Sequence, residues 1–321
     1  MKCVHCGNDG AAKFGKDRNG QQRFRCLSCK KTFVEPHALA GKQTDMKVAV
    51  QALNMLLEGM SVRSTSRLTD LDKNTILGLM VQAGESCQRF MEQAIQNRNV
   101  SAIECDEQWA FVGCKRKTQE LLELDPELQG DRYVFTAIDR DSKLLLCWHS
   151  GQRSPESTWK FADKLRASVA GCPTINTDGF NSYTFIIPFT FDNQCNYAQV
   201  IKHFQNSGGR SAATRYSPGS IISAEKRIIC GDIAIAEIGT SRMERFNLTT
   251  RMQVRRFTRL TNAHSKKTRN HDAMLGLYFA WYNWCRHHST IKTTPAVEAG
   301  LATEKWSIER LLDEAAKVTA T

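Results

Sequence analysis

Two closely spaced cysteine pairs near the N-terminus constrain the fold of this chain more than any other feature. Cys3, Cys6, Cys26 and Cys29 form C-x2-C, nineteen residues, and a second C-x2-C. Each pair places two thiolates on one tight turn, and two such turns complete a tetrahedral zinc site. A segment this short buries too little apolar surface to fold alone, so the metal must stabilise it. We therefore predict a zinc ribbon over residues 1–36, with a structural Zn²⁺ because four thiolates leave no open position.

Other interpretations of these cysteines remain open at this point. His5 lies inside the first pair and is an alternative ligand, and the pairs are also compatible with disulfides or a redox centre. The chain opens without a charged and apolar leader, which predicts a cytoplasmic, nucleoid-associated bacterial protein and disfavours disulfides. The eight remaining cysteines have no ligand spacing, and we expect them to be small buried hydrophobic residues.

The positive charge of the chain is concentrated in two segments. The 321 residues carry a formal net charge of +11. Residues 1–46 hold nine Lys/Arg against four Asp/Glu, and residues 242–269 hold nine against Glu244 alone. Either run by itself is compatible with a solvated face, but two runs beside chemical motifs favour contact with phosphates. No uninterrupted apolar stretch approaches the ~18 residues of a membrane span, so we expect double-stranded DNA and no membrane as the partner.

A helix-turn-helix domain is predicted over residues 45–95. Apolar residues recur at helical spacing from Val48 to Met60, a short helix follows over 62–68, and a third opens at Asn74. In such a domain the last helix enters the major groove by its N-terminal end. Lys73, Asn74 and Thr75 are therefore the candidate base-reading residues. A helical bundle that does not bind DNA has the same periodicity and remains an alternative.

The remaining sequence predicts a ribonuclease-H-like catalytic domain over residues 99–290, followed by a C-terminal helical tail over 291–321. Strands are expected at 100–105, 109–114, 133–138 and 144–148, then a helix at 156–169 and a strand ending at Asp178. Residues 190–240 are a probable insertion, and a long helical region is expected from Thr240 to His288. The predicted fold class is thus a multidomain α+β protein.

Carboxylates at the ends of predicted elements indicate metal-dependent phosphodiester chemistry. Such chemistry commonly uses two divalent ions about 4 Å apart, and Mg²⁺ or Mn²⁺ is held by carboxylate oxygens. Asp106 is expected at the end of the first strand, and Asp178 follows a later strand and precedes Gly179. Glu244 is the single acid of a basic helix, with Arg251 about two turns further on the same face and Arg255 extending the row. Together with Arg242 and Arg245, these arginines are candidate DNA-phosphate ligands.

The third acid is not decided by these patterns alone. Residues 241–244 also read as an S-x-x-E capping box, in which Glu244 merely satisfies a helix N-terminus. Glu225 and Glu237 are rival metal ligands. Asp139 and Asp141 fit a turn better than a metal site.

These motifs resemble the insertion-sequence-one family of bacterial DDE transposases. The resemblance rests on the CxxC pairs and on residues 106–109 (DEQW), 177–179 (TDG) and 243–248 (MERFNL), with further likeness at 255–262 and 293–296. It implies Asp106, Asp178 and Glu244 as catalytic metal ligands. It also implies that the ribbon and the helix-turn-helix bind terminal inverted repeats. The Asp178–Glu244 interval is longer than in compact members of the family.

The function predicted from the resemblance and the residues is strand cleavage and strand transfer by a DDE transposase. Because two element ends must be paired, a homo-oligomer on DNA is expected. An alternative is a non-catalytic zinc-ribbon and helix-turn-helix regulator with a degenerate C-terminal domain. A tyrosine recombinase, with Tyr282 as nucleophile assisted by His287 or His288, is disfavoured because no arginine-histidine-arginine set precedes the tyrosine.

Overall fold

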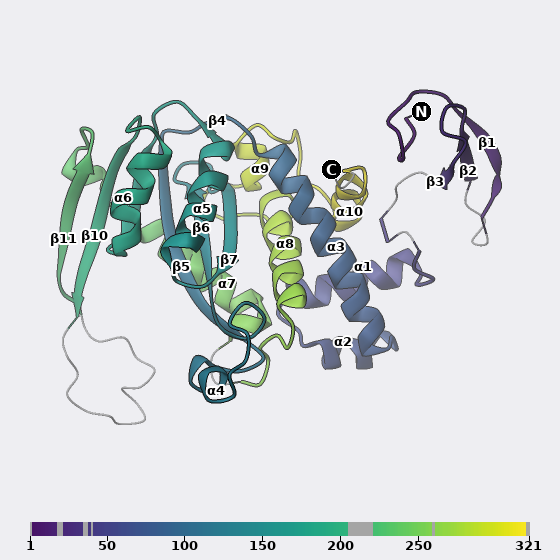
Figure 1. The fold of residues 1–321 in the computed structure, drawn as a ribbon, viewed down its shortest axis with the longest axis horizontal. Coiled ribbons are helices and arrows are strands. Elements are labelled where there is room, and N and C mark those ends of the chain that lie inside the picture. The colour runs from purple at the N-terminus through teal and green to yellow at the C-terminus, as the bar shows by residue number, and fades with distance from the viewer. Residues whose placement is uncertain are drawn as a thin grey trace.

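The N-terminal segment forms a small antiparallel sheet. The computed structural model describes residues 2–17, 22–34, 38–39, 41–204, 221–258 and 261–318. The sheet contains β1 (Ala11–Lys16), β2 (Gln22–Cys26) and β3 (Thr32–Val34) in that order (Figure 1). Its buried cluster consists of Cys3, Cys26 and Phe33 and is separate from the main core. So small an apolar cluster agrees with a fold that depends on a metal.

Three helices follow, and side-chain caps define where they begin. They are α1 (Met46–Leu57), α2 (Val62–Thr69) and α3 (Lys73–Ala94). Asp70 ends α2 in the left-handed conformation at φ 54°, and the Asp72 carboxylate accepts from the Asn74 N–H at 2.7 Å to cap α3. These two local signals produce the tight turn predicted between the last two helices. The third helix continues well beyond its predicted N-terminal part, because its later turns pack on α8 (Thr268–Trp284).

A six-stranded mixed sheet forms the centre of the molecule. Its strands are β5 (Ala102–Val112), β6 (Gly130–Asp139), β7 (Leu145–Gly151), β9 (Thr174–Asp178), β10 (Asn196–Phe204) and β11 (Ile221–Cys230), arranged in the order β11-β10-β9-β5-β6-β7. Strands β5, β6 and β7 are antiparallel neighbours, whereas β9 runs parallel to β5 and β10 runs parallel to β9. This mixed α/β arrangement is consistent with the predicted ribonuclease-H-like fold.

Two expectations about the catalytic region require correction. The strands expected at 100–105 and 109–114 are one continuous strand, β5. The region expected to be an insertion contributes β10 to the central sheet, where it pairs with β9 over five residues; residues 205–220 of that region lie outside the described part of the chain. Strand β10 was missed because Gln199 interrupts its apolar residues and Lys202 and His203 follow them, so the segment lacks a clear period.

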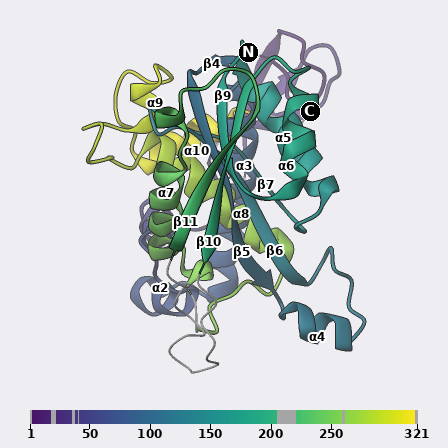
Figure 2. The same cartoon turned by 90° about the vertical axis from the view of Figure 1, so that its left-hand side faces the viewer.

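Helices cover both faces of this sheet (Figure 2). Phe135 of β6 contacts Phe161 of α5 (Pro155–Ser168) and Tyr183 of α6 (Asn181–Thr190). The next residue, Thr136, contacts Met243 of α7 (Ser241–Gln253). Because consecutive strand residues point to opposite faces, α5 and α6 lie on one face and α7 lies on the other.

The C-terminal part is not one long helical region as expected. Helix α7 ends at Gln253, a short 3-10 turn η2 (Arg255–Phe257) follows, and α8 begins only at Thr268. The smaller elements are β4 (Arg98–Asn99), α4 (Arg116–Leu121), β8 (Val169–Ala170), η1 (Ile235–Glu237), α9 (Pro295–Glu298) and α10 (Ile308–Ala316). Within the described residues, no helix combines the length and the apolar character needed to cross a membrane.

Candidate active site

Three carboxylates converge where β9 separates from β5. Oxygens of Asp106, Glu107 and Asp178 all lie within 4.8 Å of one another. The β5–β9 pairing ends at Glu104 and Asn176, so the two strands diverge just beyond that point and leave room between them. Asp178 is the last residue of β9, whereas Asp106 is the fifth residue of β5 rather than a strand end as predicted. The predicted convergence of Asp106 and Asp178 is present in the structure.

Asp106 lies on the α7 face of the sheet. Its carboxylate accepts hydrogen bonds from the Glu107 N–H at 2.8 Å and from the Asn247 side-chain amide at 2.7 Å. Desolvation, and then the neighbouring Asp178, raise the pKa of Asp106 to about 6, against the opposing effects of the Glu107 N–H, Lys202 and Arg251. A group in this state exchanges its proton readily for a bound cation near neutral pH.

Glu107 points to the opposite face, and its side chain is only 2% exposed. One oxygen, Oε2, accepts from the guanidinium of Arg153 at 3.1 Å, and the Tyr183 hydroxyl of α6 is the other polar neighbour of the carboxylate. Desolvation, and then the charge of Asp178, raise the pKa of Glu107 to about 8. A buried carboxylate without a full set of hydrogen bonds destabilises the folded state unless it binds a cation.

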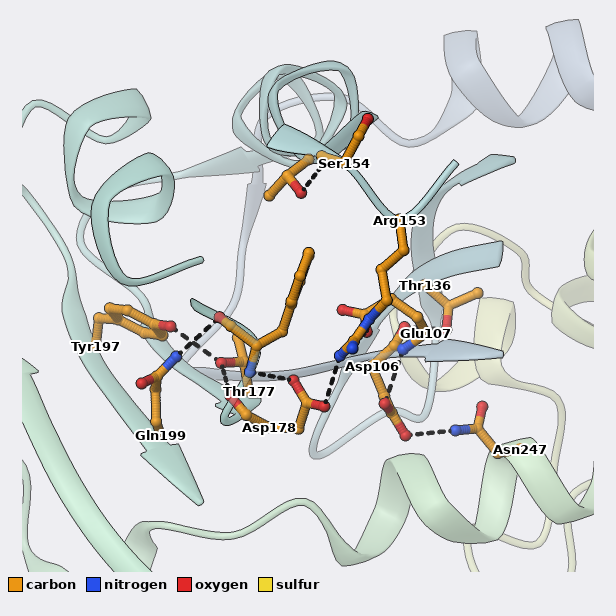
Figure 3. A network of polar contacts seen from close by, with 12 residues as sticks. Asp106, Glu107, Thr136, Arg153, Ser154, Thr177, Asp178, Tyr197, Gln199 and Asn247 are labelled. Atoms are coloured by element: carbon orange, nitrogen blue, oxygen red, sulfur yellow. Dashed lines mark hydrogen bonds and ion pairs between the residues drawn. The ribbon is translucent and has the colours of Figure 1, made fainter. Parts of the chain in front are cut away.

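Arg153 supplies the positive charge at this cluster. It lies between β7 and α5, directly before Ser154, the N-cap of that helix. Its guanidinium is 3.5 Å from Asp178 Oδ2 as well as in contact with Glu107, and it stacks over the Phe180 ring at 4.0 Å. Figure 3 shows Arg153 reaching toward both acids while Asn247 approaches Asp106 from α7.

Helix α7 is attached to the sheet by a buried acid of β5. The Glu104 carboxylate accepts from the backbone N–H groups of Arg242 and Met243 at 2.9 and 3.0 Å. This contact caps the first turn of α7 with a charge of the sign that a helix N-terminus stabilises. The N-cap is Thr240, and Ser241 makes no side-chain cap, so the S-x-x-E capping box weighed for Glu244 does not form.

Glu244 lies beside the acidic cluster and is not a member of it. Its side chain is 52% exposed and is ion-paired with Lys202 of β10, and the Thr240 hydroxyl donates to it at 3.2 Å. It precedes Asn247, the partner of Asp106, by one helical turn. Among the described residues, neither Glu225 nor Glu237 joins the acidic cluster.

The alternative acids and the candidate nucleophile have structural roles of their own. Asp139 accepts from the backbone N–H of Ser142 at 3.1 Å and so closes the β6–β7 turn, as expected. Tyr282 is 3% exposed and packs edge-on against Phe246 with ring centroids 5.0 Å apart, so it belongs to the core. A buried hydroxyl in this position does not suit a nucleophile that attacks DNA.

The candidate DNA-binding residues are distributed over two helices. Lys73 and Asn74 are exposed in the first turn of α3, and Thr75 is half-buried beside them. Arg242 and Arg245 are exposed near the start of α7, and Arg251, whose charge lowers the pKa of Asp106, lies in its last turn. Arg255 does not extend this row, because α7 ends before it and it belongs to η2.

The four N-terminal cysteines also converge. Their sulfurs lie within 4.8 Å of one another, with 3.6 Å between Cys3 and Cys29 and 3.6 Å between Cys6 and Cys26. Sulfurs of a tetrahedral zinc site with bonds of about 2.3 Å are about 3.8 Å apart, so the set fits Zn²⁺. The backbone N–H of Cys29 is the main cause that lowers the pKa of Cys26 to about 6, which favours the thiolate. The His5 ring instead contacts the Thr32 carbonyl at 3.3 Å.

The acidic cluster likewise fits a hard divalent cation. It offers carboxylate oxygens from two strands, and the buried oxygen Asn247 Oδ1 beside it has no hydrogen-bond partner. Oxygen-rich sites of this type suit Mg²⁺ or Mn²⁺.

Glu107, Arg153 and Asn247 were not assigned a role from the sequence. Glu107 is the neighbour of a predicted ligand, and strand periodicity places it on the wrong face. Asn247 is part of the motif at 243–248, which is the one signal that pointed toward it. Arg153 belongs to no motif.

Comparisons with known proteins give a distant result. No known family profile matches the chain. Among solved structures, the piggyBac transposase in a synaptic complex with hairpin DNA is similar at a TM-score of 0.34 and 10% sequence identity. That match covers 84% of this chain and 73% of the other. It is too distant to assign the chain to a family.

Proposed function

We propose that this protein is a DDE-type transposase that cleaves one DNA strand at each element end and joins the freed 3′-OH to target DNA. The observation that carries the proposal is the convergence of Asp106 and Asp178 from β5 and β9 beside an arginine-rich helix. Divalent ions bound there would activate the attacking oxygen and stabilise the leaving oxygen. Water is the first attacking group, and the released 3′-OH is the second.

Asp106 and Asp178 would hold the ions, and α7 would complete the site. Glu104 fixes the first turn of α7 to β5, and Asn247 bonds to Asp106 from the next turn. Glu244 lies on the turn between these contacts, so exchange of its Lys202 partner for an ion is the step that would make it the third ligand. Because α7 is attached to β5 at two points, it is a rigid support for such a ligand.

Basic residues of the same helix would position the DNA backbone. Arg242 and Arg245 are exposed, and Arg251 is close enough to affect Asp106 electrostatically. We propose that the zinc ribbon and the exposed start of α3 bind the terminal inverted repeats. Because such contacts release counterions, binding should weaken steeply as salt concentration rises.

The test is Mg²⁺-dependent nicking of a duplex that carries an element end. Asp178→Asn should reduce nicking by at least about a hundredfold, because the neutral amide is a poor ligand for a hard cation. Binding to the same duplex, measured by gel shift, should be retained. Glu225→Gln is the matched control: it also neutralises one acid, but on the exposed edge strand β11 outside the cluster.

Undiminished nicking by Asp178→Asn would falsify the assignment. Binding without nicking by the unaltered protein would instead support the regulator that the sequence left as an alternative. Trapping of a covalent protein–DNA adduct would contradict both.

A further inference from the structure

We propose that Glu107 is a ligand of the divalent-ion site and that Arg153 is an internal cation that occupies the same oxygens until the ion binds. The inference rests on the proposed function, because it concerns the same acidic cluster. It adds Glu107, which lies in the motif at 106–109 but was assigned no role from it, and Arg153, which belongs to no motif.

The first support is the incomplete bonding of Glu107. Its side chain is 2% exposed, Oε2 is held by Arg153, and the other polar neighbour of the carboxylate is the uncharged hydroxyl of Tyr183. A carboxylate has about four acceptor sites, so this buried group can still bind a cation in addition to these two partners. Glu107 also offers a ligand atom within 4.8 Å of those of Asp106 and Asp178.

The second support is where Arg153 places its charge. The guanidinium contacts Glu107 Oε2 at 3.1 Å and Asp178 Oδ2 at 3.5 Å, so it joins acids from two different strands. Three carboxylates this close repel one another, and a cation between them offsets that repulsion. A divalent ion would offset it more strongly, but the two cations repel each other at these distances. Ion binding therefore requires Arg153 to leave.

The third support is that Arg153 is accessible from solvent. Its side chain is 38% exposed and lies over the rings of Phe180 at 4.0 Å and Tyr133 at 5.9 Å. The contact with Asp178 is long for a charge-assisted hydrogen bond, which indicates a weak hold. A rotation of this one side chain exposes oxygens of both acids.

The experiment measures Mn²⁺ binding by isothermal titration calorimetry to the full-length, zinc-loaded protein without DNA. Arg153→Gln should bind Mn²⁺ about tenfold or more tightly than the unaltered protein, because the competing charge is gone. Arg153→Met retains the apolar stem over Phe180, removes the same charge and should show the same gain. Glu107→Gln should bind about tenfold more weakly, because a neutral amide replaces a carboxylate ligand.

Arg166→Gln is the matched control for the arginine variants. Arg166 also stacks on a ring, that of Phe191 at 5.5 Å, and its guanidinium donates to the Val169 carbonyl rather than to the acidic cluster. Its loss should leave the Mn²⁺ affinity within about twofold, because its charge lies away from the acids.

Two results would overturn the inference. Equal or weaker Mn²⁺ binding by both Arg153 variants would exclude a competing cation, and unchanged binding by Glu107→Gln would exclude Glu107 as a ligand. Absence of Mn²⁺ binding in every variant would overturn it as well. The proposed function is judged separately, since loss of nicking in Asp178→Asn can hold while these affinities do not change.

Discussion

His271 is a buried ring whose burial makes the stability of the protein depend on pH in the acid range. The side chain is fully buried in α8, and both ring nitrogens lack a hydrogen-bond partner. Burial, and to a lesser extent the charges of Arg256 and Arg132, lower the pKa of His271 to about 3. The unfolded chain takes up a proton near pH 6.5, whereas the folded protein does not. The stabilisation is therefore complete above pH 6.5 and is lost as the pH falls toward 3.

We expect this histidine to lower the free energy of unfolding by up to about 2.7 kcal/mol between pH 6.5 and pH 4.5, at about 1.36 kcal/mol per pH unit. His271→Leu should remove that part of the slope, whatever its effect on stability at pH 7.5. Urea unfolding at several pH values measures both slopes. Equal slopes in the two proteins would contradict the assignment.

At the scale of elements, the close crossing of α3 and α8 joins the N-terminal helices to the part of the chain that holds the central sheet (Figure 1). A Cβ added at Gly84 would lie 1.8 Å from the Ala273 carbonyl oxygen, which is backbone and cannot easily move. We expect Gly84→Ala to lower the free energy of unfolding by about 1–3 kcal/mol or more through overpacking. Thermal or urea unfolding measures the change.

Gly78→Ala in the same helix provides the control. Its added Cβ would meet only the flexible end of Lys42 at 3.1 Å, so the better helix propensity of alanine should stabilise the protein by about 0.5–1 kcal/mol. Equal effects of the two substitutions would show that helix propensity, and not the crossing, governs α3.

At the scale of the whole molecule, the ribbon and the main body have separate cores. We expect Cys26→Ser to lose zinc and to unfold the ribbon while the six-stranded sheet stays folded, because the metal is the main stabilising element of a sheet this small. Elemental analysis measures the zinc, and limited proteolysis should cleave mainly before Met46, where α1 begins.

Cys172→Ser, which alters an exposed thiol outside the cysteine cluster, should keep both zinc and protease resistance. Cleavage within the central sheet of the Cys26 variant would contradict separate folding.

Local signals predicted much of the fold because they act over a few residues. Ser154 and Pro155 predicted the start of α5, and α5 begins there with Ser154 as its N-cap. The cysteine spacing predicted the sulfur cluster, and the turn at 139–142 was confirmed. The expectation that the eight other cysteines are buried fails at Cys172, which is exposed after β8, and at Cys114 and Cys230, which are half-buried. Exposure depends on what packs over a residue, and no short pattern records that.

What the sequence determined by itself is the set of short-range features: the cysteine spacing, the start of α5 and the turn at 139–142, and Asp106 and Asp178 as acids of two strands that meet. Only the tertiary structure decided which other groups reach that site. Strand alternation places Glu107 and Asp106 on opposite faces of the sheet. They belong to one cluster because the pairing of β9 with β5 ends just before them, and Asp178 at the end of β9 lies close to both. Arg153 reaches the acids, and Glu244 pairs with Lys202, through the packing of elements far apart in the chain. Such positions depend on long-range packing, which local backbone preferences do not encode.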